Sequence, residues 1–455
     1  MNTTAVTVPE VEDLLARTTW PGATGRCAGV GELADRFAAA GLAPGSVVLV
    51  ALPNGTRLIR VFFALVLAGL VPTLLAASTP ATRLRATARR LGAAALVRPA
   101  GTGTGQVEEV TVTRLAEGPH RTHRPGQTIL LTSGTSGMAT GCLHDVTALR
   151  RNASRHARSI GLEAEDRMLI TLPMHYSYAL VAQVLAGLVT GASLVVTGPP
   201  FTPAGYRDVV TTHDVTVSAL TPLLVADLLA DGGALPTGLR ALGVGGHALA
   251  PARTAALLAA NPQLELYLTY GLTEAGPRVS TLAAHREPPG RFASAGTPLD
   301  GVRLSVRDAG RGPDEQEVLV TADTVYRAKV GVEGGVSRGK LVGPDTIATG
   351  DVGRLDNDGY LWLSGRISDF AIVRGDKVSL SSVRKAAESL DGVLRAVVTP
   401  PGDENAGALG LAIYVDERRS LSEKDVRRTL YPLLTPNERP GELTVHPVTA
   451  GSLHK

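Results

Sequence analysis

The sequence predicts an α/β fold: a large N-terminal body of layered α/β subdomains with a β-rich subdomain, then a small, mobile α+β C-terminal domain. Three observations lead to this prediction. In the first two thirds of the chain, short apolar runs alternate with longer stretches of helical period, as is typical of helices layered on largely parallel sheets. After Gly296 the pattern changes to hairpin-like strands. Beyond Gly365-Arg366 a third, mixed pattern begins, so we predict two domains, residues 1–366 and 367–455.

The expected elements follow in order along the N-terminal body. Apolar runs bounded by Gly, Pro or polar residues predict buried strands, and apolar positions three and four residues apart predict helices. Residues 47–52 and 71–76 are predicted strands, and each precedes a predicted helix, at 58–68 and 83–91. The same rhythm then predicts a helix at 179–189 and strands at 167–172, 193–197, 217–220, 239–244 and 264–267.

The β-rich part and the C-terminal segment show shorter elements. Alternating apolar residues predict strands at 302–306, 317–321 and 360–364, with Asp358-Gly359 as a turn before the last. In the C-terminal segment we expect strands at 370–373, 396–398 and 409–414 and helices at 381–389 and 422–433.

Composition excludes several classes of protein. The chain has 455 residues and a net charge of +3, from 45 Lys+Arg against 42 Asp+Glu, so it lacks the basic excess that neutralises nucleic-acid phosphates. Its two cysteines, Cys27 and Cys142, form neither a disulfide framework nor a metal-ligand spacing. Residues 1–10 are polar, and the longest apolar run, 61–77, is shorter than the ~20 residues of a membrane span. We expect no nucleic-acid or membrane partner and a cytoplasmic location.

The first chemical motif is the loop TSGTSGMATG at residues 132–141. It follows an apolar strand and precedes a helix that starts near Thr147. Glycines allow backbone N–H groups to approach a phosphate closely, and hydroxyls add further donors. The loop differs from a Walker motif because Cys142, not lysine, follows its last glycine. A polyphosphate cradle and a Ser/Thr/Gly surface turn both stay open from this loop alone.

Three further motifs follow the loop in order. They are Tyr270-Gly-Leu-Thr-Glu274, Thr349-Gly-Asp351, and Gly365-Arg366 with the stretch Gly375-x-Lys377-Val378. Together with the loop, they resemble the motifs of the adenylate-forming superfamily, which includes acyl-CoA synthetases, peptide-synthetase adenylation domains and luciferases. The loop departs from that family's T-S-G-[TS]-[TS]-G-x-P-K-G pattern, because Ala139 replaces the proline and Thr140 the lysine.

The resemblance implies a reaction and its cofactors. Residues 1–366 would bind ATP and the acid, and the small domain 367–455 would move against them. ATP, with Mg²⁺, would activate a small carboxylic acid to an acyl-adenylate and release pyrophosphate. The acyl group would then pass to a thiol, either CoA or the phosphopantetheine of a carrier protein.

The resemblance also implies which residues bind the nucleotide. The triphosphate would be held by Thr132, Ser133, Gly134, Thr135, Ser136 and Gly137. Tyr270 would stack on the adenine, and Gly246 and Gly271 would line the nucleotide site. Asp351 would accept hydrogen bonds from the ribose hydroxyls, and Arg366 would contact the same sugar.

Four residues are expected at the reacting groups. The resemblance makes Glu274 the Mg²⁺ ligand and Thr273 a contact to the α-phosphate. His175 would lie between the phosphate and acid pockets, although a histidine satisfied in the core is the alternative. The family carries a lysine near its C-terminus, and Lys455 is the nearest match here, displaced by a residue or two. It is either that catalytic lysine or a tail residue.

Three alternatives stay open at this stage. An amine could accept the acyl group in place of a thiol, which would make the chain an amide-forming ligase. The departures at Thr140, Ser368 and Lys455 leave open a degenerate, non-catalytic nucleotide- or acyl-binding homologue. Residues 335–339 fit the serine-hydrolase pattern G-x-S-x-G, but Gly and Pro residues around them favour a surface loop.

The resemblance also indicates the kind of acid. The family's acid-pocket segments correspond to residues 175–183, 245–248 and 268–276, and their side chains suit a modest, partly polar acid.

Overall fold

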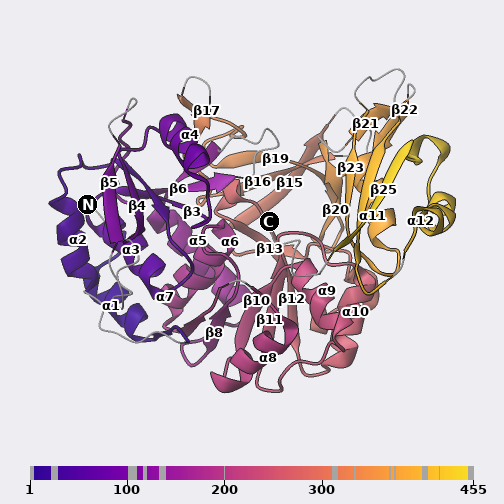
Figure 1. The fold of residues 1–455 in the computed structure, drawn as a ribbon, viewed down its shortest axis with the longest axis horizontal. Coiled ribbons are helices and arrows are strands. Elements are labelled where there is room, and N and C mark those ends of the chain that lie inside the picture. The colour runs from indigo at the N-terminus through magenta and orange to yellow at the C-terminus, as the bar shows by residue number, and fades with distance from the viewer. Residues whose placement is uncertain are drawn as a thin grey trace.

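A computed structural model describes most of the chain. The described residues are 5–21, 29–100, 110–115, 120–132, 140–198, 200–309, 316–332, 335–367, 370–373, 376–401, 408–419 and 421–448. Helices and sheets are layered from the N-terminal to the C-terminal side of the molecule, with the last strands and helices grouped at one end (Figure 1). The predicted mixed α/β class is confirmed.

A four-stranded sheet in the order β3-β2-β4-β5 forms the first layer, with β5 antiparallel to three parallel strands. All five residues of β2 are buried, because helices and neighbouring strands cover it on both faces. The elements are α1 (Val8–Ala16), α2 (Val30–Ala38), β2 (Val47–Ala51), α3 (Thr56–Leu67), β3 (Val71–Leu75), α4 (Ala81–Leu91), β4 (Ala95–Pro99) and β5 (Val110–Arg114).

An eight-stranded sheet forms the second layer in the order β1-β9-β8-β10-β11-β12-β13-β14. Its first six strands are parallel, β13 runs antiparallel to β12, and β14 runs antiparallel to β13. The strands are β1 (Thr18–Thr19), β8 (Arg167–Ile170), β9 (Ser193–Val196), β10 (Val217–Leu220), β11 (Ala241–Gly245), β12 (Glu265–Gly271), β13 (Arg278–Ala283) and β14 (Thr297–Pro298).

Helices connect the strands of this sheet. Threonine side chains cap α8 and α9, and a proline follows each cap, as expected for helix starts. The predicted helix at 179–189 forms as three consecutive pieces, of which the middle one is π-helical. The helices are α5 (Val146–Ser159), α6 (Ser177–Ala179), η1 (Leu180–Leu185), α7 (Ala186–Thr190), α8 (Pro203–Thr212), α9 (Pro222–Ala230), α10 (Pro251–Ala260), η2 (Thr273–Ala275), η3 (Ala284–Arg286) and η4 (Pro289–Arg291).

Two smaller sheets make up the β-rich part. One is antiparallel in the order β15-β16-β19-β20, and the other, β18-β17-β7-β6, joins strands from distant parts of the sequence. Figure 1 shows β17 close to α4, and β17 pairs with β7 in this sheet. The strands are β6 (Gln127–Thr132), β7 (Thr140–Asp145), β15 (Val302–Asp308), β16 (Gln316–Ala322), β17 (Ala328–Val332), β18 (Gly335–Ser337), β19 (Thr346–Leu355) and β20 (Leu361–Arg366).

The surface loop predicted at residues 335–339 is partly wrong. Gly335–Ser337 forms the edge strand β18, because β17 pairs with β7 on one side and offers its other edge to this segment. The side chain of Val336 is half exposed, as expected at a sheet edge. No helix follows the serine, so the hydrolase elbow is absent from this described segment.

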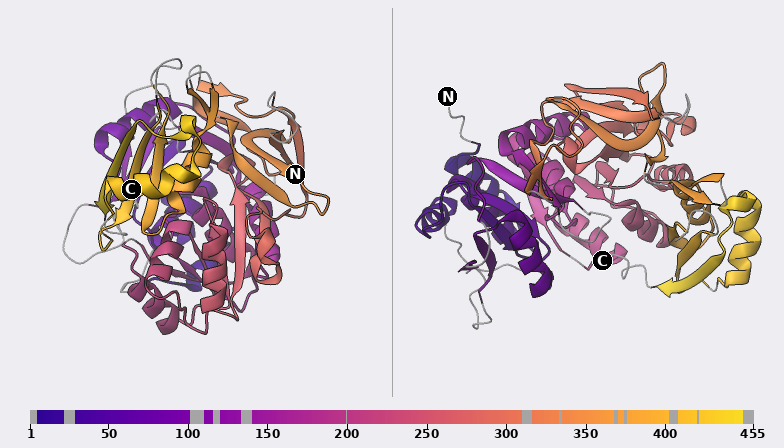
Figure 2. Two further views of the ribbon diagram at one scale, coloured as in Figure 1. Left: turned by 90° about the vertical axis from the view of Figure 1, so that its right-hand side faces the viewer. Right: turned by 90° about the horizontal axis from the view of Figure 1, so that it is seen from above.

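The C-terminal elements have a core of their own, formed by side chains between Val373 and Leu443. A hairpin leads into α11, and β23, β24 and β25 form a three-stranded sheet. Figure 2 shows these elements grouped beside the larger body. The boundary at 366/367 stays a prediction. The elements are β21 (Phe370–Val373), β22 (Asp376–Ser379), α11 (Leu380–Glu388), β23 (Val393–Thr399), β24 (Gly410–Asp416), α12 (Glu423–Leu430), η6 (Tyr431–Leu433), η7 (Pro436–Glu438) and β25 (Glu442–Val448).

A helix that crosses a membrane must be long and apolar. Among the described helices, none has the length and the apolar character for it.

Two buried histidines should make the free energy of unfolding depend on pH. Burial lowers the pKa of His144 to about 4 and that of His156 to about 3, and neither Nδ1 atom has a hydrogen-bond partner within the described structure. Below pH 6.5 these two histidines bind protons in the unfolded chain but not in the folded chain, so acid favours unfolding. We expect each histidine to cost about 2 kcal/mol of unfolding free energy between pH 6.5 and pH 5.

Urea unfolding at a series of pH values measures this effect. His156→Leu should remove about 2 kcal/mol of the loss, whereas the exposed His446, changed to Gln, should leave the loss unchanged. An equal pH dependence in the His156→Leu variant and in the unchanged protein would contradict the prediction.

Candidate active site

The strands β6 and β7 hold the two ends of the glycine-rich loop. Thr132 pairs directly with Thr140, and the Thr132 hydroxyl lies 3.2 Å from the Thr140 carbonyl oxygen and 3.1 Å from its hydroxyl. Thr132 is the one predicted phosphate-binding loop residue that the structure places. The other five, Ser133, Gly134, Thr135, Ser136 and Gly137, lie outside the described residues.

Thr273 and Glu274 form the short turn η2 directly after β12, at the carboxyl edge of the large sheet, where ligands bind in α/β folds. The Thr273 carbonyl accepts a hydrogen bond from His144 Nε2 at 2.9 Å, and its hydroxyl lies 3.0 Å from the hydroxyl of Ser177. The Glu274 carbonyl accepts from the Tyr326 N–H at 3.0 Å. Fixed on both sides, this turn presents a largely buried carboxylate, 11% exposed.

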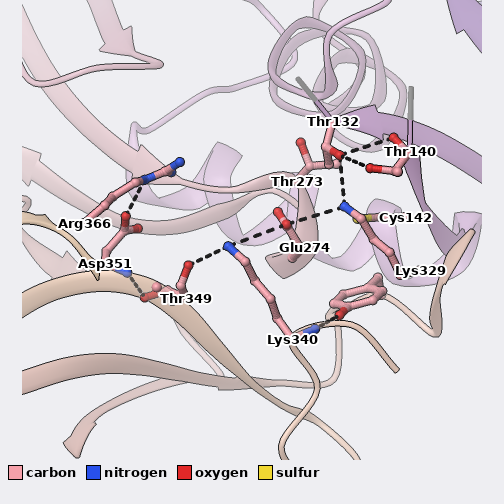
Figure 3. Close-up of polar contacts among 12 residues, drawn as sticks. Thr132, Thr140, Cys142, Thr273, Glu274, Lys329, Lys340, Thr349, Asp351 and Arg366 are labelled. Carbon is pink, nitrogen blue, oxygen red and sulfur yellow. Dashed lines mark hydrogen bonds and ion pairs between the residues drawn. The ribbon is translucent and has the colours of Figure 1, made fainter. Parts of the chain in front are cut away.

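Two lysines flank the Glu274 carboxylate (Figure 3). The Nζ atoms of Lys329 and Lys340 lie 3.7 and 3.8 Å from Glu274 Oε1. Lys329 also donates to the Thr132 hydroxyl at 2.9 Å, and Lys340 to the Thr349 carbonyl at 2.6 Å. A chain of polar contacts therefore joins the glycine-rich loop, the Thr273-Glu274 turn and β19.

Sequence reasoning missed both lysines, because they lie between the motifs in a segment that resembles no signature. A signal was present. The chain has six lysines and none before position 329, so Lys329 and Lys340 are the only lysines among residues 1–366. In a segment that otherwise uses arginine for positive charge, both lysines reach the same carboxylate.

The predicted ribose site is assembled at β19 and β20. Asp351 pairs with Arg366 across these strands, and Arg366 Nε donates to Asp351 Oδ1 at 2.7 Å. The Tyr270 hydroxyl donates to the other carboxylate oxygen at 2.5 Å. Burial and the neighbouring Asp351 raise the pKa of Tyr270, so its hydroxyl keeps its proton. Tyr270 was predicted to stack on adenine, and the structure adds this contact to Asp351.

The two predicted glycines lie at the ends of neighbouring parallel strands. Gly246 follows β11 with a φ of +93°, a conformation that favours glycine. Gly271 ends β12, and a Cβ there would lie 1.8 Å from the Pro277 carbonyl oxygen. A Cβ on Gly246 would meet no atom within 4 Å, whereas Gly271 is required by the close approach of the backbone at Pro277.

His175 lies in the loop between β8 and α6, two residues before the Ser177 that contacts Thr273. Its ring packs 4.3 Å from that of Tyr176. Burial lowers the pKa of His175 to about 4, so the imidazole is neutral at pH 7. Lys455 lies outside the described residues, and its role stays a prediction.

The fold and the residues gathered at this edge of the large sheet match the class expected from the motifs, that of an adenylate-forming enzyme. A family model described as AMP-binding enzyme matches residues 28–319, well over half of the chain, so the chain belongs to the AMP-binding enzyme family. The predicted superfamily is confirmed, and with it the class of AMP-forming acid ligases.

Curated relatives are acid–CoA ligases. The chain is 29% identical over 413 residues to a sulfoacetate–CoA ligase of Cupriavidus necator, covering 83% of this chain and 79% of that enzyme. It is 27% identical over 296 residues to a 2-succinylbenzoate–CoA ligase of Bacillus pumilus, covering 64% of this chain and 59% of that enzyme. The second match thus spans less than two thirds of the relative.

Solved structures share the fold over nearly the whole chain. The o-succinylbenzoate CoA synthetase of Bacillus subtilis, bound to its acyl-adenylate, has a TM-score of 0.79 at 19% identity and covers 96% of each chain. An amide bond synthetase from Marinactinospora thermotolerans has a TM-score of 0.75 at 22% identity and covers 98% of this chain and 97% of that one. The predicted two-domain layout is confirmed at the level of the fold.

The donor set fits Mg²⁺ that arrives with ATP. Among the described residues, no three His, Cys, Asp or Glu side chains gather into a metal cluster. Mg²⁺ usually binds proteins through one or two carboxylates and completes its shell with phosphate oxygens and water. Glu274 supplies one such carboxylate, and a solved relative holds both ATP and magnesium.

Proposed function

We propose that this chain uses ATP to activate a small carboxylic acid as an acyl-adenylate, releases pyrophosphate, and then transfers the acyl group to the thiol of CoA. The observation that carries the proposal is the convergence of Thr132, the Thr273-Glu274 turn and Asp351 beside the carboxyl end of β12. The CoA ligases among the curated relatives support the choice of acceptor.

Each group has a role in this proposal. Mg²⁺, held by Glu274 and ATP, would offset phosphate charge as pyrophosphate leaves. The Thr273 hydroxyl, oriented by Ser177, would donate to the α-phosphate. Asp351, with Tyr270 and Arg366 on its oxygens, would hold the ribose. The carboxylate attack is then a matter of positioning and charge stabilisation, because no covalent enzyme intermediate is needed.

A buried arginine without a carboxylate partner contacts residues of the segments that are predicted to line the acid pocket. Arg278 is 4% exposed, its guanidinium lies 4.2 Å from the ring centre of Tyr178, and its Nη1 donates to the Thr269 hydroxyl at 2.9 Å. A Cβ on Gly245 would come within 3.1 Å of the same nitrogen. Within the described structure its Nε has no hydrogen-bond partner, and no carboxylate forms an ion pair with it.

An unpaired buried cation favours an anionic ligand, because the desolvated charge gains most from an opposite charge. Tyr178, Gly245 and Thr269 all belong to the segments predicted to line the acid pocket. We therefore extend the proposal: the acid carries a second anionic group, which Arg278 binds while the first carboxylate reacts.

ATP–pyrophosphate exchange across a panel of acids tests the function and the substrate class together. The panel pairs acetate with sulfoacetate and butanoate with succinate, and adds 2-succinylbenzoate. We expect exchange, with kcat/KM about 10- to 100-fold higher for the member of each pair that has a second anion. Arg278→Met should remove this preference, and Arg278→Lys should keep part of it.

Two outcomes would contradict these proposals in different ways. Exchange that is fastest with the monocarboxylates, or a preference that survives Arg278→Met, would refute the second anion. Binding of ATP without exchange for any acid would favour the non-catalytic homologue. Once an acid is found, offering CoA and a simple amine to the adenylate separates thioester formation from the amide-forming alternative.

Three expectations remain within the proposal. They are a carrier protein as acceptor, a cytoplasmic location, and movement of residues 367–455 against residues 1–366. The separate core between Val373 and Leu443 supports the last of these.

A further inference from the structure

The glycine-rich loop lacks a cation of its own. Thr140 stands where the resembled signature has a lysine, and its polar atoms contact the Thr132 hydroxyl within the hairpin. A triphosphate brings about four negative charges, and neutral hydroxyl and amide donors offset them only in part. The position of other cations near this loop therefore decides how the phosphates are held.

Strand register places Lys329 on the face of the sheet where a lysine at position 140 would project. Lys329 of β17 pairs with Cys142 of β7, and Cys142 is two residues from Thr140. Residues that pair directly, and residues two apart on one strand, point to the same face. The Lys329 ammonium accordingly reaches the Thr132 hydroxyl at 2.9 Å, at the mouth of the loop (Figure 3).

The contacts of Lys329 do not neutralise its positive charge, so the ammonium can bind a phosphate. Its close neighbours are the Thr132 hydroxyl and, at 3.6 Å, the sulfur of Cys142, whose pKa burial raises to about 12, so the thiol is neutral. The Glu274 carboxylate, at 3.7 Å, is beyond hydrogen-bond distance and also faces Lys340 at 3.8 Å. Two ammonium groups share one carboxylate, which leaves a local excess of positive charge next to the loop.

Charge balance also changes when Mg²⁺ arrives. A metal ion on the Glu274 carboxylate would repel the neighbouring ammonium groups. Lys329 has a flexible four-carbon stem, so we expect its ammonium to turn from Glu274 to a phosphate oxygen by side-chain rotation. A compact ammonium suits this shift between partners better than the fixed fork of an arginine.

We propose that Lys329 is the triphosphate-binding cation of this enzyme and takes the place of the lysine that its glycine-rich loop lacks. The inference rests on the nucleotide site of the proposed function and assigns the charge to a strand that is distant in sequence. It adds a specific expectation: Lys329 contacts the β- or γ-phosphate, and so distinguishes ATP from AMP.

Calorimetric binding of MgATP and of AMP, without acid so that no turnover occurs, tests the assignment. Lys329→Met should weaken MgATP binding about 10- to 100-fold, the loss of one charge-assisted hydrogen bond, and leave AMP binding within about twofold. Lys329→Arg should retain part of the MgATP affinity. Lys424→Met, on the exposed face of α12, is the control and should bind both nucleotides normally.

Moving the charge is the sharper test. In the Lys329→Met background, Thr140→Lys should restore MgATP binding to within about fivefold of the unchanged protein, and the uncharged Thr140→Met should not. The assignment would be overturned if Lys329→Met weakened MgATP and AMP binding equally, or weakened neither. It would also be overturned if Thr140→Lys and Thr140→Met had equal effects on MgATP binding while the melting temperature stayed unchanged. Absence of acid-dependent exchange in the unchanged protein would refute the proposed reaction and leave these binding results interpretable.

Discussion

Replacing Glu274 by glutamine should reduce acid-dependent ATP–pyrophosphate exchange about a thousandfold or more, the largest loss that we expect from a single substitution in this chain. Glutamine keeps the size of the side chain and one carbonyl oxygen but loses the negative charge. The charge is needed to hold Mg²⁺ against two ammonium groups less than 4 Å away. With a neutral amide, Lys329 and Lys340 would disfavour the metal.

The same substitution should change the dependence on Mg²⁺. Because the remaining ligands come from ATP, we expect the residual exchange to require about tenfold more Mg²⁺ than the unchanged protein. Glu265→Gln is the matched control. It lies at the start of β12, the strand that leads to the Glu274 turn, and its carboxylate pairs with Arg240 at 2.9 Å, so exchange should stay within about threefold. Normal exchange by a folded Glu274→Gln protein would rule out the metal role.

Ordered motifs made much of this site predictable. The ordered motifs led to Thr132, Tyr270–Glu274, Asp351 and Arg366, and the structure places these residues close together. Strands with strong local patterns were also predictable, and the predicted strand at 217–220 coincides with β10. In these cases the information lies within a few consecutive residues.

What could not be predicted depends on contacts between distant segments. The pairing of β17 with β7 joins residues nearly 190 positions apart, as in Lys329 and Cys142, and the hydrophobic pattern of neither strand specifies its partner. Without that pairing, Lys329 has no visible relation to the loop. The contact between Tyr270 and Asp351 was missed for the same reason, because the motif indicates a role but no side-chain orientation.

Asp351→Ala should have the second largest effect, on nucleotide binding as a whole. The Asp351 carboxylate is 6% exposed, and Arg366 and Tyr270 orient both of its oxygens. A preorganised, charged acceptor for two hydroxyls contributes about 3 kcal/mol, so we expect the dissociation constants of both ATP and AMP to rise about 100-fold. Asp358→Asn, in the exposed turn before β20, should leave both unchanged.

The ratio of the two affinities separates the sugar site from the phosphate site. Both nucleotides carry the same ribose, so loss of Asp351 must weaken the binding of both equally, whereas loss of Lys329 should weaken the binding of ATP alone.

Removing a ribose hydroxyl from the ligand gives an independent check. The unchanged protein should bind 2′-deoxy-AMP and 3′-deoxy-AMP about tenfold more weakly than AMP, and Asp351→Ala should not distinguish the three. If the variant still penalises a missing hydroxyl by tenfold, then another group binds the sugar, and the pairing of Asp351 with Arg366 serves only to join β19 to β20.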